Sequence, residues 1–215
     1  MAARPAKTAG FIATPREDVC LDFVNTRSWR GRETPGEELH GLDDVLAWAR
    51  GAGGVDVEIA QSFQDWWRPR PRAASAVFTE AIALREALFR LFEAVSSGEA
   101  PDPAALDVLN AALGSAAPRS RVAPRADALV WSVDGLVPGM AALLSPVLWS
   151  ASDLLAGTRR RRVRLCANPQ CRWVFLDDSK SGTRRWCSMA SCGNRAKAHR
   201  HYLKRRKATH AEENE

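Results

Sequence analysis

Four of the five cysteines lie in one short C-terminal stretch as two pairs, Cys166 with Cys171 and Cys187 with Cys192, in the spacing C-x4-C-x15-C-x4-C. Zinc takes four tetrahedral ligands, and structural sites are closed by thiolates that arrive as two short loops from separate pieces of backbone. A secreted domain would oxidise such pairs to disulfides, whereas a reducing cytoplasm keeps thiolates free for metal. The spacing therefore predicts one structural zinc ion, bound by these four cysteines, in a cytoplasmic protein.

The charge of the chain is distributed unevenly around these cysteines. Of the 31 lysines and arginines, 16 lie in residues 158–207, with only two of the 25 acidic residues, Asp177 and Asp178. The rest of the chain holds 15 basic and 23 acidic side chains, so a net charge of +6 conceals a strongly basic segment and an acidic remainder. Such asymmetry indicates a nucleic-acid-binding module joined to an ordinary globular domain.

The basic segment is predicted to be a zinc finger made of a hairpin and a helix. Residues 172–176 alternate and favour a strand, residues 177–182 favour a turn, and residues 183–186 lead back, which predicts a hairpin between the cysteine pairs. Ser188 is a favourable N-cap for a helix that reaches about Lys207. Knuckle, hairpin and helix in this order are typical of a treble-clef-like finger.

The predicted helix has one face toward the metal and a charged remainder. Cys192, Ala196, His199 and Leu203 recur at helical steps and should face the metal and the hairpin. The other faces and the hairpin carry groups that can neutralise phosphates or reach base edges. The candidate nucleic-acid-binding residues are Arg184, Arg185, Asn194, Arg195, Lys197, Arg200, His201, Lys204, Arg205 and Arg206.

Some residues near the cysteines have a purely structural alternative. A zinc ion with four thiolates carries a net negative charge, which Arg184, Arg185 or Arg195 can offset without touching a nucleic acid. Trp173 and Trp186 can stack on bases, but aromatic residues beside metal ligands favour a role in the small core of a finger.

Residues 11–157 are predicted to form a mostly helical α+β domain with a small antiparallel sheet. Four segments are expected to be helices: residues 42–50 and 75–97, which repeat apolar residues at helical steps, residues 57–67, and residues 102–113, which follow a break at Gly98 and have Pro103 in the first turn. Residues 75–97 are apolar over so much of their circumference that this helix should lie at the centre of the domain.

The other segments of this domain are less regular. Residues 121–123 and 129–133 are expected to pair as a hairpin, and Gly135 supplies a turn. For residues 19–26 a short strand and a buried helical turn both stay open. Residues 138–156 form the last expected helix, and their prolines and polar side chains favour a kinked buried helix over a membrane span.

Three polar residues interrupt apolar runs in the N-terminal domain and are candidates for lining a small-molecule pocket: Asp22, Asn25 and Arg85. The alternative is that they cap helices or pair with each other. No set of nucleophile, base and orienting group occurs at a recognisable spacing. We therefore do not expect an enzyme.

Residues 166–202 resemble the CGNR zinc finger, named for the motif at residues 192–195. All four cysteines, the FLD turn approach, the RRWCSM stretch and the CGNR-x-K run coincide with that family. In the family the finger follows a domain called ABATE, and residues 21–26 (LDFVNT), Trp48 and residues 84–88 (LREAL) are similar to landmarks of that domain. The resemblance implies a bacterial, stress-related transcription regulator that binds DNA.

The expected organisation is thus an ABATE-like domain at residues 11–157, a four-cysteine CGNR-type finger at residues 158–207 and a disordered tail at residues 208–215. The finger should bind double-stranded DNA, while the larger domain senses a small-molecule effector or forms a homodimer. Two alternatives stay open. The same basic face suits RNA or a ribosome, or the finger is a protein-interaction module beside a small-molecule-binding domain.

Overall fold

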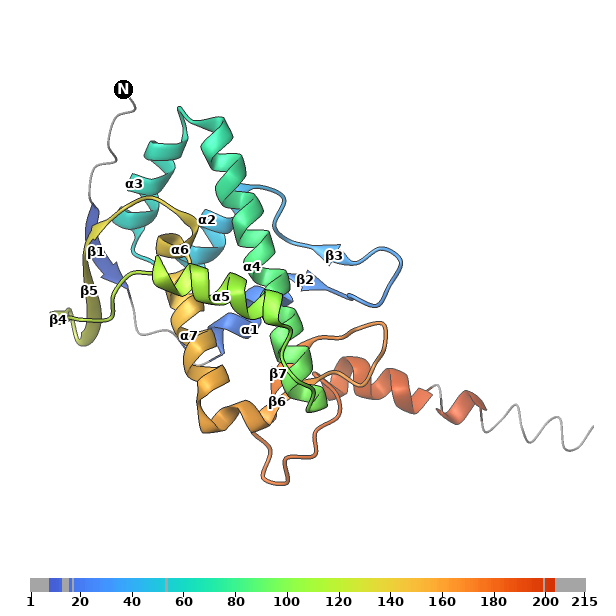
Figure 1. Cartoon of the computed structure of the whole chain (residues 1–215). Helices are drawn as coiled ribbons and strands as arrows, with labels where there is room; N and C mark the ends of the chain where they lie inside the picture. Colours follow the sequence, from blue (N-terminus) through green and yellow to red (C-terminus); the bar gives the residue numbers. More distant parts are fainter. Residues whose placement is uncertain (1–7, 13–15, 17, 53, 199, 204–215) are drawn as a thin grey trace, which may run out of the picture.

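A long central helix, α4 (Pro71–Ser97), organises the fold (Figure 1). The computed structural model describes residues 8–12, 16, 18–52, 54–198 and 200–203. Pro71 occupies the first turn of α4, and Gly98 ends the helix with a φ of 76°. The helix begins four residues before the predicted start at residue 75. The sequence did not reveal this first turn, because it is exposed and carries no apolar pattern.

The described part of the N-terminal domain contains six other helices: α1 (Val19–Asn25), α2 (Leu42–Gly51), α3 (Val57–Trp67), α5 (Pro103–Gly114), α6 (Met140–Leu143) and α7 (Ser145–Ala156). Helices α2, α3 and α5 follow the predicted segments closely. The side chains of Asp56 and Asp102 cap α3 and α5 by accepting hydrogen bonds from the backbone N–H groups of Glu58 and Ala104. The predicted mostly helical α+β class is confirmed.

The structure also defines residues 19–26, which the sequence left open, and residues 138–156, which were expected to form one kinked helix. Residues 19–26 form the buried helix α1 and not a strand. Residues 138–156 form two helices, because Leu144 ends α6 and Pro146 occupies the first turn of α7, where its missing N–H costs nothing. No helix in the described part of the chain has the length and apolar character needed to cross a bilayer.

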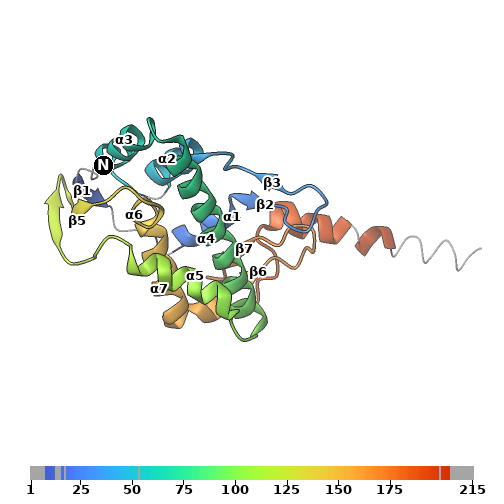
Figure 2. The ribbon, with the colours of Figure 1, turned by 45° about the horizontal axis from the view of Figure 1, so that its top comes forward.

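A three-stranded antiparallel sheet lies at the end of the domain away from the finger (Figures 1 and 2). Its order is β1 (Thr8–Ile12), β5 (Ala128–Leu136), β4 (Val122–Arg125). The β4–β5 hairpin was expected, whereas β1 was not. Gly135 lies within β5 and not in a turn, and its φ of 71° accompanies the shift in pairing between Thr8 and Gly10.

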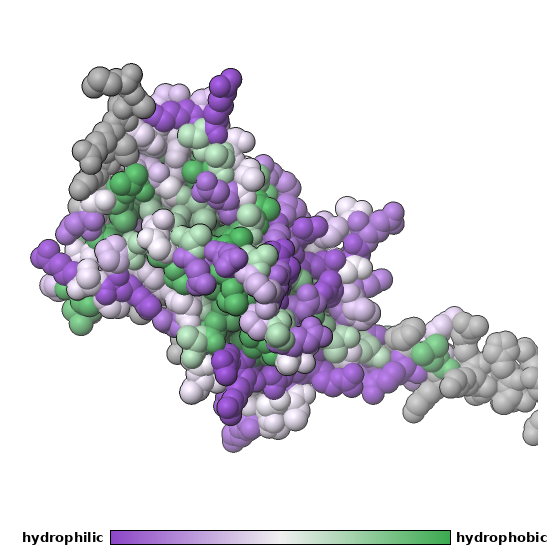
Figure 3. All heavy atoms as spheres, in the orientation of Figure 1, coloured by the Kyte–Doolittle hydropathy of each residue, from purple (hydrophilic) through white to green (hydrophobic). Residues whose placement is uncertain are grey.

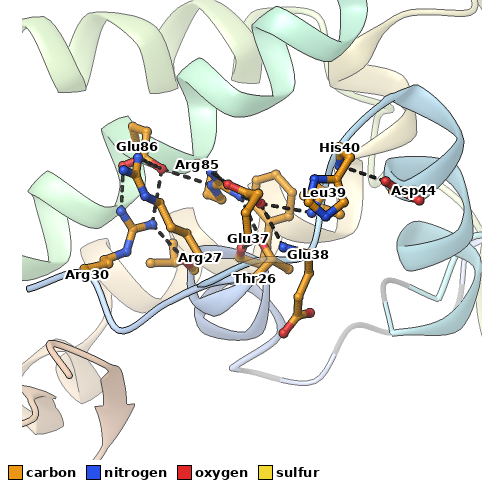
Figure 4. Close-up of polar contacts among 12 residues, drawn as sticks. Thr26, Arg27, Arg30, Glu37, Glu38, Leu39, His40, Asp44, Arg85 and Glu86 are labelled. Atoms are coloured by element: carbon orange, nitrogen blue, oxygen red, sulfur yellow. Dashed lines mark hydrogen bonds and ion pairs between the residues drawn. The ribbon is translucent and has the colours of Figure 1, made fainter. Parts of the chain in front are cut away.

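A second pair of strands, β2 (Arg27–Ser28) and β3 (Gly36–Glu37), extends from beside α4 toward the finger (Figure 2). The buried side chain of Arg85, on α4, holds this pair (Figure 4). Its guanidinium group donates to both carboxylate oxygens of Glu37, each at 2.6 Å, and to Thr26 Oγ1 at 3.2 Å. An arginine with so little exposed surface requires this degree of pairing.

Glu86 extends the same network toward the finger (Figure 4). Its carboxylate accepts from Arg85 Nε at 3.0 Å and from Arg30 Nη1 at 2.6 Å. Burial raises the pKa of Glu86, but the hydrogen bond and charge of Arg30 outweigh it and hold the pKa below its usual range. The network therefore links α4 to the chain on both sides of β2.

One apolar core runs from the N-terminal domain into the beginning of the finger. Strands β6 (Val163–Leu165) and β7 (Val174–Leu176) pair antiparallel, and Val163, Val174 and Leu176 are buried in the same cluster as the residues of α1 and α4. Asn25 of α1 fixes this junction, because its side-chain amide donates to the Val174 carbonyl at 2.8 Å and accepts from the Val174 N–H at 3.1 Å.

Candidate metal centre and nucleic-acid interface

The first cysteine loop is a tight turn between β6 and β7. Cys166 follows β6, and Cys171 lies shortly before β7. Asn168 closes the turn, since its carbonyl accepts from the Cys171 N–H at 2.9 Å and its side-chain oxygen accepts from the Gln170 N–H at 3.1 Å. Arg172 adopts a φ of 52° just after the turn, which directs the chain into β7.

The hairpin differs from the predicted one. Strand β7 pairs with β6 and not with residues 183–186, so the first cysteine pair lies in the hairpin connection. Residues 183–186 form a loop, because Asp177 accepts from the Ser179 and Arg184 N–H groups and turns the chain there. The three-residue strand β6 follows an arginine run and carries too short a pattern to be recognised.

The second cysteine pair lies where the finger helix begins. The Arg185 carbonyl accepts from the Ala167 N–H at 2.9 Å, which brings the second loop against the first. The predicted N-cap, Ser188, accepts from the Ser191 N–H at 3.3 Å and starts a wide helical turn at Met189–Gly193, which contains Cys192. Residues 194–198 and 200–203 continue as helix.

The four cysteine sulfur atoms all lie within 4.8 Å of one another. The Cys171 and Cys187 sulfurs are 3.7 Å apart, and the Cys187 and Cys192 sulfurs are 3.9 Å apart. Four sulfurs bound at about 2.3 Å to one tetrahedral zinc ion would be about 3.8 Å apart. The separations therefore fit a single zinc ion, which would be structural because the four sulfurs complete its coordination.

The closeness of these sulfurs prevents all four from ionising unless a cation lies among them. The hydrogen bond from Cys171 lowers the pKa of Cys166 to about 2, whereas sharing that bond raises the pKa of Cys171 to about 12. The same neighbours raise the pKa of Cys187. Thiolates this close repel one another, and a divalent cation among them allows all four to ionise.

A small apolar shell surrounds the sulfurs. Cys166, Cys171 and Cys192 cluster with Phe175, and partly buried aromatic residues pack against them: Trp29, Trp173 and Trp186. The side-chain amide of Asn168 donates to the Cys192 sulfur at 3.5 Å. A Cβ at Gly193 would lie 2.6 Å from the Met189 sulfur, which belongs to a flexible and exposed side chain.

The charged side of the finger helix is open to solvent. Hydrophilic residues cover the part of the molecule formed by the finger and the neighbouring β2–β3 hairpin (Figure 3). Among the predicted nucleic-acid-binding residues, Asn194, Arg195, Lys197, Arg200 and His201 lie on the described part of the helix, and all five are exposed. Asn194 also donates to the Ala190 carbonyl at 3.3 Å. Lys204, Arg205 and Arg206, with His199 and the tail at residues 208–215, lie outside the described residues.

Arg184 and Arg185, in the loop before the second cysteine pair, are both exposed and contact the loop itself. Arg184 donates from Nε to the Trp186 carbonyl at 2.9 Å and also to the Cys187 carbonyl, so it braces the second cysteine loop. The Arg185 guanidinium lies 5.5 Å from the centre of the Trp186 ring. The contacts of Arg184 therefore support the alternative that this arginine stabilises the metal site and does not contact a nucleic acid.

Leu203 departs from the predicted inward face. Cys192 is buried and Ala196 is half-buried, but Leu203 is 42% exposed. Figures 1 and 2 show that the end of the helix extends beyond the rest of the finger. The inward face therefore ends after Ala196, because the end of the described helix projects away from the hairpin.

The three candidate pocket residues are engaged separately, each with a protein partner. Asp22 pairs with Arg16 at the surface, Asn25 joins α1 to β7, and Arg85 is the centre of the buried ion-pair network. These contacts favour the alternative, in which the three residues pair with other protein groups, over a pocket at these positions. Asn25 and Arg85 instead stabilise contacts between elements far apart in the sequence.

A different part of the N-terminal domain is hollowed. A groove of about 790 Å³ lies between α2, α3 and the start of α4, with His40, Asp44, Gln64, Trp67, Arg68 and Phe78 among its lining residues. It combines apolar rings with groups of both charges, which is the composition of many small-molecule sites. The sequence carries no signal for it, since its residues come from three separate helices.

Two residues that were not among the predicted site residues join the finger to the larger domain. Arg172 pairs with Glu93 of α4, and its guanidinium lies 5.2 Å from the centre of the Phe89 ring. Trp29, in the β2–β3 loop, packs against the cysteine cluster. Neither residue has a periodic or motif signal, because the contacts depend on how distant segments are arranged.

Comparison with known families agrees with this architecture. The model described as "ABATE: Putative stress-induced transcription regulator" matches residues 17–158, and the CGNR zinc finger model matches residues 162–205. Neither description is that of an enzyme family. A search of curated proteins finds no match. The chain therefore belongs to the ABATE family and carries a C-terminal CGNR zinc finger, whose four clustered cysteines suit one structural zinc ion.

Proposed function

We propose that the protein is a zinc-dependent DNA-binding transcription regulator. In this proposal Cys166, Cys171, Cys187 and Cys192 bind one zinc ion, and the exposed side of the following helix contacts DNA. Lys197, Arg200 and His201 carry the described part of that contact. The regulator description of the ABATE family supports this role.

The single observation behind this proposal is the charge of the finger helix. Residues 194–203 contain no acidic side chain, and Arg195, Lys197 and Arg200 are all exposed. Cationic side chains on one projecting helix suit the phosphates beside a DNA groove, and the amide of Asn194 suits a base edge. A helix that served only to hold the metal would not need three solvent-accessible cations.

Zinc dependence follows from where this helix begins. Cys192 lies in its first, wide turn, and the other cysteines come from the loops beneath it. The finger's own apolar cluster is small, so metal binding is expected to supply much of the folding free energy of this region. Removal of zinc should therefore abolish DNA binding.

The N-terminal domain is proposed to supply the regulatory input, by binding an effector in the groove between α2, α3 and α4 or by forming a homodimer. We propose no catalytic role. A reducing compartment such as the cytoplasm fits the proposal, because thiolate ligands require it.

Fluorescence anisotropy with labelled duplex DNA and with structured RNA at equal ionic strength tests the proposal. If about six phosphates are neutralised, the logarithm of the affinity should fall with that of the salt concentration with a slope of about −5. The Lys197→Ala/Arg200→Ala variant should reduce this slope to about −3. The Arg50→Ala/Arg72→Ala variant is the matched control, since both arginines are exposed on the N-terminal domain.

Each alternative has its own outcome in this assay. Tighter binding to RNA than to DNA at every salt concentration would favour the RNA-associated alternative. Absence of binding to either polymer by the zinc-loaded protein would instead contradict nucleic-acid binding and favour a protein-interaction module.

A further inference from the structure

The loop between β2 and β3 lies directly against the first cysteine loop. The Gly31 N–H donates to the Gln170 carbonyl at 3.2 Å. A Cβ at Gly31 would lie 1.8 Å from the Pro169 carbonyl oxygen, so no larger residue fits without moving the backbone. The N-terminal domain therefore reaches the metal centre itself through this loop.

Trp29 in this loop brings two arginines together. The Arg32 guanidinium carbon lies 3.8 Å from the centre of its ring, and that of Arg195, on the finger helix, lies 4.6 Å from the same point. The two guanidinium carbons are therefore at most 8.4 Å apart, the sum of these distances. Arg195 is a predicted nucleic-acid-binding residue, whereas Arg32 belongs to the other domain.

Both guanidinium groups are available to a partner. Arg32 and Arg195 are both exposed, and in the described part of the chain neither has a carboxylate within ion-pair distance. By contrast, Arg27 and Arg30 in the same hairpin are paired with Glu86. Two cations held close together without a counterion repel each other, and a polyanion relieves this repulsion.

The spacing suits consecutive phosphates. Phosphates on one strand of a duplex advance by about 3.4 Å each along the helix axis, so guanidinium groups no more than 8.4 Å apart can contact neighbouring ones. Stacking on Trp29 restricts both side chains, which lowers the conformational entropy lost when they bind.

We propose that Arg32 is part of the nucleic-acid-binding face, so that this face extends from the finger helix across Arg195 and Trp29 onto the N-terminal domain. The inference rests on the proposed function of the finger. Its ligand is the phosphate backbone, which carries no sequence information, and Arg32 therefore contributes affinity and orientation. Binding would then depend on how the N-terminal domain is placed against the finger.

The test measures binding of the full-length, zinc-loaded protein to the duplex DNA and the structured RNA used for the finger variants. Arg32→Ala should weaken binding to the preferred polymer about fivefold and reduce the magnitude of the salt slope by about 1. Arg32→Lys keeps the charge and should retain most of the slope. Arg72→Ala removes one exposed arginine at the start of α4, away from the finger, and should change neither quantity.

A second variant tests whether removing a negative charge beside Arg32 strengthens binding. Glu33 is exposed and follows Arg32 in the loop, so its carboxylate repels a phosphate that approaches Arg32. Glu33→Gln should therefore strengthen binding, by about twofold at low salt, and the gain should disappear at high salt.

Three results would overturn the inference. If Arg32→Ala leaves affinity and salt slope unchanged while Lys197→Ala/Arg200→Ala weakens binding, the face is confined to the finger and the proposed function stands. If Arg32→Ala lowers the Tm but not the slope, Arg32 only braces the loop. If the unmodified protein binds neither polymer, the proposed function fails together with this inference.

Discussion

The two regions of the molecule are stabilised in different ways. The N-terminal domain buries a large apolar core around α4, and its buried arginine, Arg85, is completely paired. The apolar cluster of the finger consists of three cysteines and Phe175, with a few partly buried aromatic residues around it. The domain can therefore fold by removing apolar surface from water, whereas the finger needs the metal.

The part of the chain stabilised by the apolar core extends past the first two cysteines, as far as β7. The apolar residues of β6 and β7 belong to the core of the N-terminal domain, and Asn25 and Arg172 add polar contacts across the junction. The finger is thus built on a hairpin that the larger domain already holds. Metal loss should consequently unfold the part after β7 and spare the hairpin.

Removing zinc should give the largest effect. Chelation, or Cys192→Ser, should remove the metal and unfold the second loop and the helix, since zinc contributes about 10 kcal/mol to folding of isolated fingers. Hydrogen exchange should show lost protection at residues 177–203 and retained protection at β6 and β7. Metal analysis should return close to one equivalent for the unmodified protein.

Cys20→Ala is the matched control for this experiment. Cys20 is a cysteine buried in the N-terminal core, and burial raises its pKa to about 12, so it remains a thiol. This variant should lose about 1 kcal/mol of stability and no metal. A Cys192→Ser protein that keeps a full equivalent of zinc and a protected helix would contradict the comparison.

In the finger, the sequence predicts features that depend on neighbouring residues but not those that depend on contacts with the other domain. The four cysteines and the Ser188 cap are local chemistry, and the structure brings all of these groups to the expected places. The predicted strand partner of β7 was wrong, because pairing with β6 depends on the core of another domain. The roles of Trp29 and Arg172 were missed for the same reason.

In the N-terminal domain, too, the sequence predicts local structure but not the contacts between distant residues. Helices with long apolar patterns, such as α3 and α4, were predicted closely, because periodicity is a local property. Asn25 and Arg85 were recognised as unusual, but the sequence does not show that their partners are Val174 and Glu37. A buried polar group indicates that a partner exists without identifying it.

The second-largest effect should come from the buried arginine. Arg85→Ala leaves Glu37 and Glu86 partly buried without their shared partner, and we expect a loss of about 3 kcal/mol in the free energy of unfolding. Arg90→Ala, also on α4, removes an exposed pair with Asp102 and should cost less than about 1 kcal/mol. Urea denaturation at constant zinc measures both, and equal losses would mean that the network does not stabilise the domain.

Asn25 gives a smaller effect that tests the shared junction. Asn25→Ala leaves the Val174 N–H and carbonyl unpaired in the core, at a cost of about 2 kcal/mol. Hydrogen exchange should increase in β7 and in α1, while the metal stays bound. Asn110→Ala, an exposed position on α5, should change neither stability nor exchange. Loss of zinc from the Asn25 variant would show that the junction, and not the sulfurs alone, holds the finger.

The titration of Glu37 should produce the smallest effect, because this carboxylate is partly exposed and water screens its charge. Burial raises the pKa of Glu37, but the hydrogen bonds from Arg85 outweigh it, so the pKa lies below its ordinary value of 4.5. A lowered pKa means that the ionised form stabilises the fold, fully above pH 4.5 and progressively less as the pH falls toward the folded-state pKa.

Glu37→Gln removes this titration but keeps an oxygen for Arg85. The unmodified protein should therefore lose more stability than Glu37→Gln between about pH 5 and about pH 3, although protonation of the cysteine ligands affects both proteins equally. Parallel stability curves for the two proteins would show that the ionised Glu37 adds nothing to the N-terminal domain.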